Sequence, residues 1–291
     1  MSLAFGAHVS VSGGVDKAFA RAEEFQMDGI QIFSKNERQW RAKPLADDVI
    51  ERWFDERERT GISKIVAHAS YLINLATPRE DLREKSLAAF LEELDRCEML
   101  DIPSLVIHPG AHTGSGEDVG VKAVADALNQ VHELRPDHKV RTLLETTAGQ
   151  GTTLGRTFEE LAAIIDQVEA KERVMVCLDT CHVFAAGYDI RRPESYAAVM
   201  LHFAHTIGID RLQAIHLNDS QNGPGTNKDR HEHIGQGEIG LEGFRNIVND
   251  PRLIGVPGLL ETEKGENNVE DGRNLARLRD LAERPVGTTA E

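Results

Sequence analysis

Cysteine and aromatic residues are scarce in this sequence. It contains three cysteines, Cys97, Cys177 and Cys181, and aromatic residues make up 5% of its 291 residues. Three scattered cysteines exclude a disulfide framework, so the cytoplasm is the expected compartment. We expect Cys177 and Cys181 to be buried packing residues rather than metal ligands.

Long apolar runs are also missing. No segment approaches the roughly 20 consecutive apolar residues that a membrane-spanning helix needs. Residues 1–12 lack a basic stretch followed by an apolar core, so we expect no secretory signal. These absences predict a protein without a membrane partner.

Basic residues are outnumbered by acidic ones. The chain has 33 Lys and Arg against 48 Asp and Glu, a net charge of −15. This balance argues against a nucleic-acid partner, which usually leaves a basic footprint, and most of the carboxylates are expected on a solvated surface. A nucleic acid could still bind where metal ions and a few arginines neutralise the charge locally.

Short apolar runs alternate with longer amphipathic stretches along the whole chain. The strand-like runs are residues 5–9, 29–33, 64–68, 104–108, 142–145, 174–179, 212–217 and 258–261. The helix-like stretches lie around residues 14–26, 46–60, 79–100, 118–134, 157–170, 194–207, 241–249 and 268–283. Eight such units predict the α/β class and a (β/α)₈ TIM barrel, with a doubly wound open sheet as the alternative. Since no linker or low-complexity segment interrupts the chain, we expect a single domain over residues 1–291, with its core at about 4–283.

Most of the predicted strands carry an imidazole or a carboxylate near the carboxyl end. Barrel enzymes place their catalytic groups at this rim, and the needs of packing do not explain so many polar side chains there. Imidazole and carboxylate ligands without thiolate suit a catalytic zinc, manganese or iron site. The residues concerned are His8, His68, His108, Glu145, Asp179, His216 and Glu261.

Two pairs outside the strand interiors add candidate ligands. Asp179 and His182 are three residues apart just past a strand, so they can point in different directions and serve different metals. Asp229 and His231 lie two apart in an extended loop, where side chains i and i+2 share a side and can hold one ion. Alone, this second pair would be interpreted as a polar solvated loop; together with the strand ends, it is interpreted as a pair of ligands.

The remaining histidines fall outside this pattern. We expect His132 on a solvated helix. For the others we expect a position at the surface or around the site: His112, His138, His202, His205 and His233.

Several long motifs in one order resemble the endonuclease IV family of apurinic/apyrimidinic endonucleases. The match runs from Gly6 to about Glu263, and its most specific segments are GAHVSVSGG (6–14), KNERQWRAKPL (35–45), HASYLINL (68–75), ETTAGQG (145–151), DTCHVFAAGYD (179–189) and DRHEHIGQGEIG (229–240). The resemblance implies a barrel with three Zn²⁺ ions at its rim, which Mn²⁺ could replace. The first ion would be held by His68, His108 and Glu145; the second would share Glu145 and add Asp179, His216 and Glu261; the third would be held by His182, Asp229 and His231.

The sequence departs from the family pattern at three places. Thr146 stands where the family commonly has asparagine, which would alter a hydrogen bond around the ligands. Ala69 replaces a residue that is often acidic or polar, and the loop 220–228 also varies. Because none of these positions is an implied ligand, we expect an altered rather than an abolished activity.

The resemblance also implies a reaction and a substrate. The implied reaction is hydrolysis of the phosphodiester 5′ to abasic sites in duplex DNA, leaving a 3′-hydroxyl and a 5′-deoxyribose phosphate, as part of base excision repair. The catalytic residues would be Glu145 and Glu261. Arg38, Tyr71 and Leu72 would enter the minor groove and help to extrude the abasic nucleotide, since apolar wedges can offset the cost of unstacking. A monomer would suit an enzyme that seats a duplex across its rim.

Two other interpretations remain open from the residues alone. A sugar or sugar-phosphate isomerase on a related barrel would use the same ligand types, with a lysine or histidine for proton transfer. A non-enzymatic scaffold that stores metal or binds DNA is the second. Without the resemblance, residues 71–73 would be interpreted as a packed apolar loop.

Overall fold

Eight parallel strands close into a barrel, as the sequence predicts. The computed structural model describes residues 3–282. In its central sheet each strand pairs with the next along the chain from β1 to β7, β7 pairs with β10, and β10 pairs with β1. Going round the barrel, the strands are β1 (Ala4–His8), β2 (Gly29–Phe33), β3 (Lys64–His68), β4 (Ser104–Ile107), β5 (Arg141–Glu145), β6 (Val174–Asp179), β7 (Leu212–His216) and β10 (Pro257–Leu260). Pairing of Ala4 with Pro257 closes the ring, so the alternative of an open doubly wound sheet is wrong.

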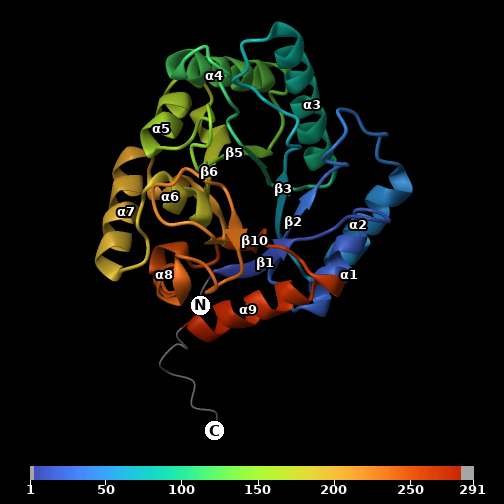
Figure 1. The fold of residues 1–291 in the computed structure, drawn as a ribbon. Coiled ribbons are helices and arrows are strands. Elements are labelled where there is room, and N and C mark those ends of the chain that lie inside the picture. Colours follow the sequence, from blue (N-terminus) through green and yellow to red (C-terminus); the bar gives the residue numbers. More distant parts are fainter. Residues whose placement is uncertain (1–2, 283–291) are drawn as a thin grey trace.

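Helices follow the strands and surround the barrel (Figure 1). They are α1 (Lys17–Glu24), α2 (Asp47–Thr60), α3 (Glu80–Met99), α4 (Glu117–Leu134), α5 (Phe158–Asp166), α6 (Thr180–Ala186), α7 (Pro193–Thr206), α8 (Gly240–Val248) and α9 (Val269–Leu281). The short helix α6 lies within a segment for which the sequence predicts no helix. The predicted strands 5–9, 104–108, 212–217 and 258–261 each end one residue earlier in the structure. The end of the predicted stretch 268–283 lies outside the described residues.

The local sequence explains where these helices begin and end. Asp47 and Asp48 occupy the first turn of α2, where carboxylates interact favourably with the helix dipole. Gly61 ends the same helix in the left-handed conformation that glycine adopts without strain. Thr157 caps α5 by accepting a hydrogen bond from the Glu160 amide. Local signals of this kind separate helices from the neighbouring strands.

Two apolar layers hold the barrel together. The larger layer lies between the strands and the surrounding helices and includes the fully buried Phe19, Trp53 and Phe90. The smaller fills the barrel interior, with one residue from each of six strands: Val66, Val106, Leu143, Cys177, Ala214 and Leu259. Because the interior is packed with side chains, the barrel presents its polar groups at the strand ends and not in a central channel.

One histidine prediction is wrong. His132 lies on α4, but it is buried and not solvated. Burial, and then the nearby Arg173 guanidinium, lowers the pKa of His132 to about 4. Helical periodicity places residue 132 on the face that packs against the barrel, which the polar character of histidine concealed.

Short 3₁₀ turns accompany the later strands: Lys171–Arg173, Ile209–Arg211 and Pro251–Leu253; another, Glu266–Asn268, precedes α9. Two-residue strands β8 (Asp219–Ser220) and β9 (His231–Glu232) form an antiparallel ribbon beyond β7. Among the helices of residues 3–282, none has the length and apolar character needed to cross a membrane.

Candidate metal centre

Six of the nine candidate ligands follow an interior apolar residue by two positions. Val66 precedes His68, and Leu143 precedes Glu145. The same spacing relates Val106 to His108, Cys177 to Asp179, Ala214 to His216 and Leu259 to Glu261. Side chains two residues apart on a strand lie on the same face. On each of these strands the apolar residue faces the barrel interior, so the side chain two positions later also faces inward and lies at the rim. The barrel thus brings these six together.

Glu145 lies at the middle of the cluster and is fully buried. Its Oε2 atom is 3.0 Å from the Nε2 atoms of both His68 and His108. Its Oε1 atom is 3.0 Å from Nδ1 of His216. The two carboxylate oxygens therefore face two separate groups of imidazoles, which is the geometry required of a bridging ligand.

A second group forms around the other oxygen of Glu145. His216 Nδ1 is 3.2 Å from Oε2 of Glu261 and 3.7 Å from Oδ2 of Asp179. The ligand atoms of these four residues all lie within 4.8 Å of one another, as do those of His68, His108 and Glu145. The spacing suits two neighbouring cations that share one carboxylate.

The third group comes from α6, the loop before β9 and the first residue of β9. Asp179 caps α6 by accepting a hydrogen bond of 2.8 Å from the His182 amide. The His182 ring lies between two carboxylates, with Nδ1 3.3 Å from Glu145 Oε1 and Nε2 on the side of Asp229. Asp229 Oδ1 is 3.2 Å from His182 Nε2 and 3.4 Å from His231 Nε2. The structure therefore places Asp179 and His182 in different groups and brings His182, Asp229 and His231 into one.

Hydrogen bonds fix which nitrogen of two imidazoles faces the centre. Nδ1 of His68 donates to the Ala69 carbonyl at 2.8 Å, and Nδ1 of His182 donates to the Thr146 carbonyl at 2.8 Å. With the proton on Nδ1, the Nε2 lone pair of each ring points toward carboxylate oxygen. The buried Nε2 atoms of His182 and His231 have no hydrogen-bond partner among the described residues. A nitrogen that faces a carboxylate across about 3 Å needs a cation between the two, either a proton or a metal ion, and a set of imidazoles and carboxylates of this kind fits a metal.

The charges at the rim point the same way. Burial alone would raise the pKa of Glu145, but the His108 and His216 imidazoles hold it well below the usual value. Burial likewise opposes ionisation of Glu261, and His216 again holds its pKa well below the usual value. The pKa of Asp229 is lowered by His182 against the effect of burial. These carboxylates are therefore ionised at neutral pH and present a concentrated negative charge to a cation.

A thiol lies close enough to be considered as a further ligand. The ligand atoms of Asp179, Cys181 and His231 also lie within 4.8 Å of one another. Cys181 Sγ, however, donates to the Arg230 carbonyl at 3.5 Å, and burial raises the pKa of this thiol to about 12. A protonated thiol is a poor ligand. We therefore interpret Cys181 as a packing residue, and Cys97 and Cys177 are also buried and free.

The three candidate DNA-reading residues lie in the loops that follow β2 and β3. The Arg38 side chain is 88% exposed and Tyr71 is 69% exposed, while Leu72 is half-buried. The Tyr71 ring centre is 6.1 Å from that of His68. Tyr71 also lines a cavity of about 310 Å³ with candidate ligands from all three groups. A large aromatic ring thus stands in solvent beside the cluster.

Gln31 is a part of the centre that the sequence analysis missed. It is fully buried on β2 and donates to Glu261 Oε1 at 2.5 Å, while its Oε1 atom lies 2.8 Å from His216 Nε2. The Nε2 atom of Gln31 also lies 3.0 Å from His8 Nδ1. His8 therefore contacts the cluster through Gln31 and Glu261. The sequence does mark this residue, because Gln31 is the only polar side chain in the apolar strand 29–33 and the alternation of the strand turns it toward the barrel interior.

Two departures from the family pattern can now be placed. The Thr146 hydroxyl accepts a hydrogen bond from the Asp179 amide at 2.9 Å. Threonine at this position therefore still supplies a side-chain hydrogen bond to the backbone of a candidate ligand. Ala69 acts through its carbonyl, which any residue at this position supplies. Asn218 links two candidate ligands, donating to Asp179 Oδ2 at 2.7 Å and accepting from the Glu261 amide at 2.8 Å.

A second missed residue, Asp219, organises the loop that carries Asp229 and His231. Its buried carboxylate accepts backbone hydrogen bonds of 2.8 to 3.3 Å from residues 220, 235, 237, 239 and 240. Gly237 is required for this arrangement, because a Cβ atom there would lie 2.6 Å from Asp219 Oδ1 and 2.3 Å from the Ser220 carbonyl oxygen. One carboxylate therefore holds the two ends of this loop together, at residue 220 and at residues 235–240.

Replacement of Asp219 by asparagine is expected to loosen this loop. An amide offers one acceptor where the carboxylate offers two, so several amides lose their partner at about 1 kcal/mol or more each. Trypsin should then cut after Lys228 or Arg230 in this loop at least several-fold faster than in the parent. The metal content should fall with it. Asp126→Asn, which alters an exposed pair with Lys122 on α4, serves as the control; equal cleavage of the two variants would contradict this role.

Comparisons with known proteins agree with this arrangement. The family described as xylose isomerase-like TIM barrel matches residues 19–281. A probable endonuclease 4 of Chloroflexus aurantiacus is 53% identical over 279 residues, which are 96% of this chain and 98% of the relative. The crystal structure of endonuclease IV from Thermus thermophilus superposes with a TM-score of 0.84 at 34% identity, covering 95% of this chain and 98% of that one.

More distant structures share only the fold. A D-tagatose 3-epimerase-like protein superposes with a TM-score of 0.72 at 19% identity, over 96% of this chain and 98% of its own. Identity at this level supports the barrel but not a shared reaction. The near-complete coverage at 53% identity is decisive, and the chain belongs to the endonuclease IV family.

Proposed function

We propose that the protein is a zinc-dependent endonuclease that hydrolyses the phosphodiester 5′ to abasic sites in duplex DNA. The products would be a 3′-hydroxyl and a 5′-deoxyribose phosphate, within base excision repair. Its family makes the chain a metal-dependent hydrolase with an endonuclease role in DNA repair. The observation that carries the finer proposal is the set of three neighbouring ligand groups, two of which share Glu145.

The nine candidate ligands would hold three Zn²⁺ ions, which Mn²⁺ could replace. Bound zinc lowers the pKa of a water molecule to about 7 and neutralises the charge of the phosphate under attack. Glu145 would fix the distance between two of the ions, because its two oxygens face different imidazoles. Glu261 lies at the open side of the same group, beside the cavity that Tyr71 lines. We assign Glu145 and Glu261 as catalytic residues for this reason.

The acidic composition is compatible with a DNA substrate. Three divalent cations would bring six positive charges to four ligand carboxylates: Glu145, Asp179, Asp229 and Glu261. The rim would then be locally positive on a molecule of net charge −15. Attraction of this kind is short-ranged and weakens steeply as salt rises.

Recognition of the abasic site would fall to the loops after β2 and β3. Tyr71 and Leu72 would enter the duplex beside the cluster, and Arg38 would follow the groove; the exposure of Tyr71 and Arg38 supports these roles. An abasic nucleotide lacks the stacking of a base, so its extrusion costs less than that of an intact nucleotide. A rim that must seat a duplex favours a monomer, and the cytoplasm of a bacterial cell holds such a substrate.

A sugar isomerase would need a base for proton transfer in the same cavity. The lysine that lines it, Lys264, is bound to both carboxylate oxygens of Asp271 at 2.8 and 2.9 Å. Because this ion pair occupies the Lys264 side chain, its geometry does not favour a role in proton transfer. The lysine of this cavity therefore gives no support to isomerisation, and the family favours phosphodiester hydrolysis.

The test compares two duplexes that differ only in one abasic site. We expect cleavage of the abasic strand alone, with products whose ends are read by mobility and by ligation to a 5′-phosphate partner. Prior removal of metal with a chelator should abolish cleavage, and added Zn²⁺ should restore it. Chelation should also lower the Tm, because it leaves the buried carboxylates of the centre without a counterion. Cleavage that survives metal removal, or equal cleavage of both duplexes, would contradict the proposal, as would turnover of a ketose by the same preparation.

A further inference from the structure

Helix α3 holds the two loops in which the candidate DNA-reading residues lie. The first loop, residues 34–46 between β2 and α2, carries Arg38. The second, residues 69–79 between β3 and α3, carries Tyr71 and Leu72. Both loops lack regular secondary structure, so their relative position depends on other contacts. Three side chains of α3, Glu92, Glu93 and Arg96, supply them.

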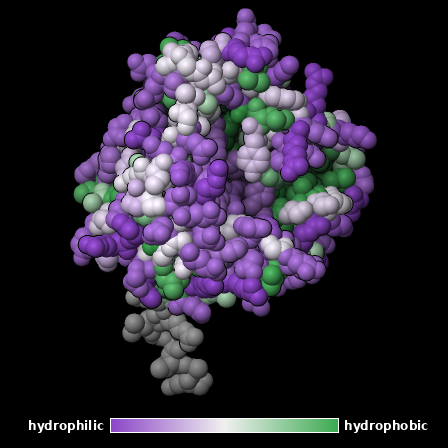
Figure 2. Space-filling view, in the orientation of Figure 1, coloured by the Kyte–Doolittle hydropathy of each residue, from purple (hydrophilic) through white to green (hydrophobic). Residues whose placement is uncertain are grey.

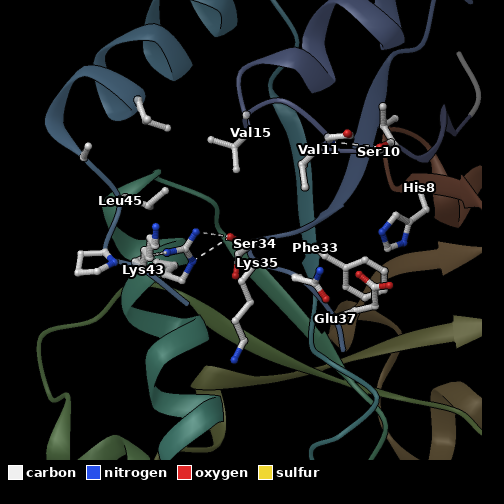
Figure 3. A pocket seen from close by; sticks show the side chains of 18 of the residues that line it. His8, Ser10, Val11, Val15, Phe33, Ser34, Lys35, Glu37, Lys43 and Leu45 are labelled. Atoms are coloured by element: carbon white, nitrogen blue, oxygen red, sulfur yellow. Dashed lines mark hydrogen bonds between the residues drawn. The ribbon is translucent and has the colours of Figure 1, made fainter. Parts of the chain in front are cut away.

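Two of these side chains fasten the first loop at its ends. The Arg96 guanidinium donates from Nε to the Ser34 carbonyl at 2.8 Å and from another nitrogen to the Lys43 carbonyl at 3.1 Å. Glu92 Oε1 accepts from the Ala42 amide at 2.8 Å. Arg96, Ser34 and Lys43 also line a cavity of about 710 Å³ formed mainly by the loops after β1 and β2 (Figure 3). The ends of the first loop are therefore held by α3.

Glu93 connects the two loops through a buried ion pair. Its Oε1 atom is 3.5 Å from Lys35 Nζ, and each side chain is only 1% exposed. Lys35 Nζ also donates to the Trp40 carbonyl at 2.8 Å, within the first loop. On the other side, the Glu93 carboxylate accepts from the Ser70 amide at 3.2 Å, within the second loop. In Figure 3 the Lys35 side chain extends from the first loop, just after the end of β2.

Ser70 adds a direct contact between the loops. Its hydroxyl donates to the Glu37 carbonyl at 2.5 Å and accepts from the Leu72 amide at 3.2 Å. Glu37 immediately precedes Arg38, and Ser70 immediately precedes Tyr71. A shift of Ser70 therefore moves the neighbours of all three candidate DNA-reading residues together.

A buried ion pair is a costly way to stabilise a protein. Burial raises the pKa of Glu93 to about 7, even though Lys35 and the Ser70 amide oppose this rise. Apolar residues of similar volume often stabilise a fold as well as such a pair does. They could not, however, hold the Trp40 carbonyl and the Ser70 amide at once. The pair is therefore better explained by the position it gives to the loops than by stability.

We propose that Glu93, together with Lys35, is a positioning residue that sets Arg38 against Tyr71 and Leu72 and thereby sets the selectivity for abasic over intact duplex. The inference rests on the proposed function. Glu93 touches no candidate metal ligand by hydrogen bond or ion pair in the described residues, so it would act on recognition and not on metal binding.

The test uses the full metal-loaded protein and two variants, Glu93→Gln and Lys35→Met. Trp40 and Trp53 are the only tryptophans of the sequence, and Trp53 is fully buried. Quenching of tryptophan fluorescence by acrylamide therefore reports on Trp40 in the first loop, with no DNA present. We expect quenching to rise in both variants while the metal content stays at the parental value. We also expect the preference for abasic over intact duplex to fall by about 10- to 100-fold, mainly through KM, as misplacement of groups remote from the chemistry does.

Asp250→Asn is the matched control. Asp250 is also a buried carboxylate paired with a cation, Arg252, but it precedes β10 at the opposite end of the barrel. This variant should lower stability without changing Trp40 quenching or selectivity. Unchanged quenching in Glu93→Gln and Lys35→Met overturns the coupling of the loops. Increased quenching with parental selectivity overturns the role in recognition. A parent protein that does not prefer abasic duplex refutes the proposed function instead, and the quenching result still decides whether Glu93 couples the loops.

Discussion

Replacement of Glu145 by glutamine is expected to remove two metal ions at once and to reduce cleavage by about 10³-fold or more, the scale of losing a preorganised electrostatic group. Each of the two Glu145 oxygens faces a different group of imidazoles, at 3.0 Å in each case. Glutamine keeps the size of the side chain but replaces one oxygen by a donor and removes the charge. Neither group would then keep its full set of ligands.

Elemental analysis of gently purified protein measures this directly. The parent should contain about three transition-metal ions, chiefly zinc, because its ligands divide into three groups. Glu145→Gln should lose two of them. His231→Ala is the comparison, since His231 belongs to the third group and reaches the second only through Asp179 at 3.6 Å and the Glu261 carbonyl at 3.3 Å; it should lose one ion. Parental metal content in Glu145→Gln, or cleavage that persists with fewer than two ions bound, would show that Glu145 is not a bridge.

The strand pattern made the barrel predictable. Successive side chains of a strand point alternately into the barrel and toward the helices. Residues 66 and 68 of β3, and residues 143 and 145 of β5, all point inward, up to the end of each strand. The same period-two rule that predicts the strands also gathers the ligands at one rim. The sequence analysis placed His68, Glu145 and Asp179 at strand ends, and the structure has each as the last residue of its strand. Fold and cluster thus follow from one local pattern.

The missed features depend on contacts between distant parts of the chain. Asp219 and Gly237 are 18 residues apart, and the carboxylate accepts from that amide at 3.1 Å. Glu93 and Lys35 belong to different barrel units, and charged residues in helices are usually solvated, so nothing local marks this pair as buried. Helix α6 is hidden for a different reason: its residues 180–186 are fixed by the Asp179 cap and by packing, and seven residues are too few for a clear helical period.

The surface combines an acidic molecule with a specific site. Figure 2 shows a largely hydrophilic face, on which apolar residues gather toward the side of α2 and α3. Trp40 and the apolar residues Ala88 and Ala89 line a cavity there with charged neighbours. A net charge of −15 would repel DNA from most of the surface, while the metal-loaded rim would attract DNA locally. Binding of abasic duplex should therefore weaken with added salt, with a slope set by the few phosphates that the rim contacts.

Replacements of Tyr71 and Glu261 are expected to damage different steps. Tyr71→Ala removes an exposed ring that contacts the cluster only at its edge, with its centre 5.5 Å from Phe33 and 6.1 Å from His68. Loss of an aromatic side chain that stacks in DNA costs about 1–3 kcal/mol, or roughly 10- to 100-fold in affinity. We expect weaker binding of abasic duplex, lower selectivity and parental metal content.

Glu261→Gln should bind abasic duplex nearly as the parent does and yet fail to cleave it. Glu261 lies in the second ligand group and accepts from Gln31, so its loss affects the reacting centre and not the exposed loops. Single-turnover kinetics separate the two steps, because saturating enzyme restores the rate of Tyr71→Ala but not that of Glu261→Gln. Arg38→Ala should behave like Tyr71→Ala, since the Arg38 side chain is 88% exposed and belongs to no ligand group. If Tyr71→Ala lost metal, or bound abasic and intact duplexes as the parent does, recognition and chemistry would share residues that the structure keeps apart.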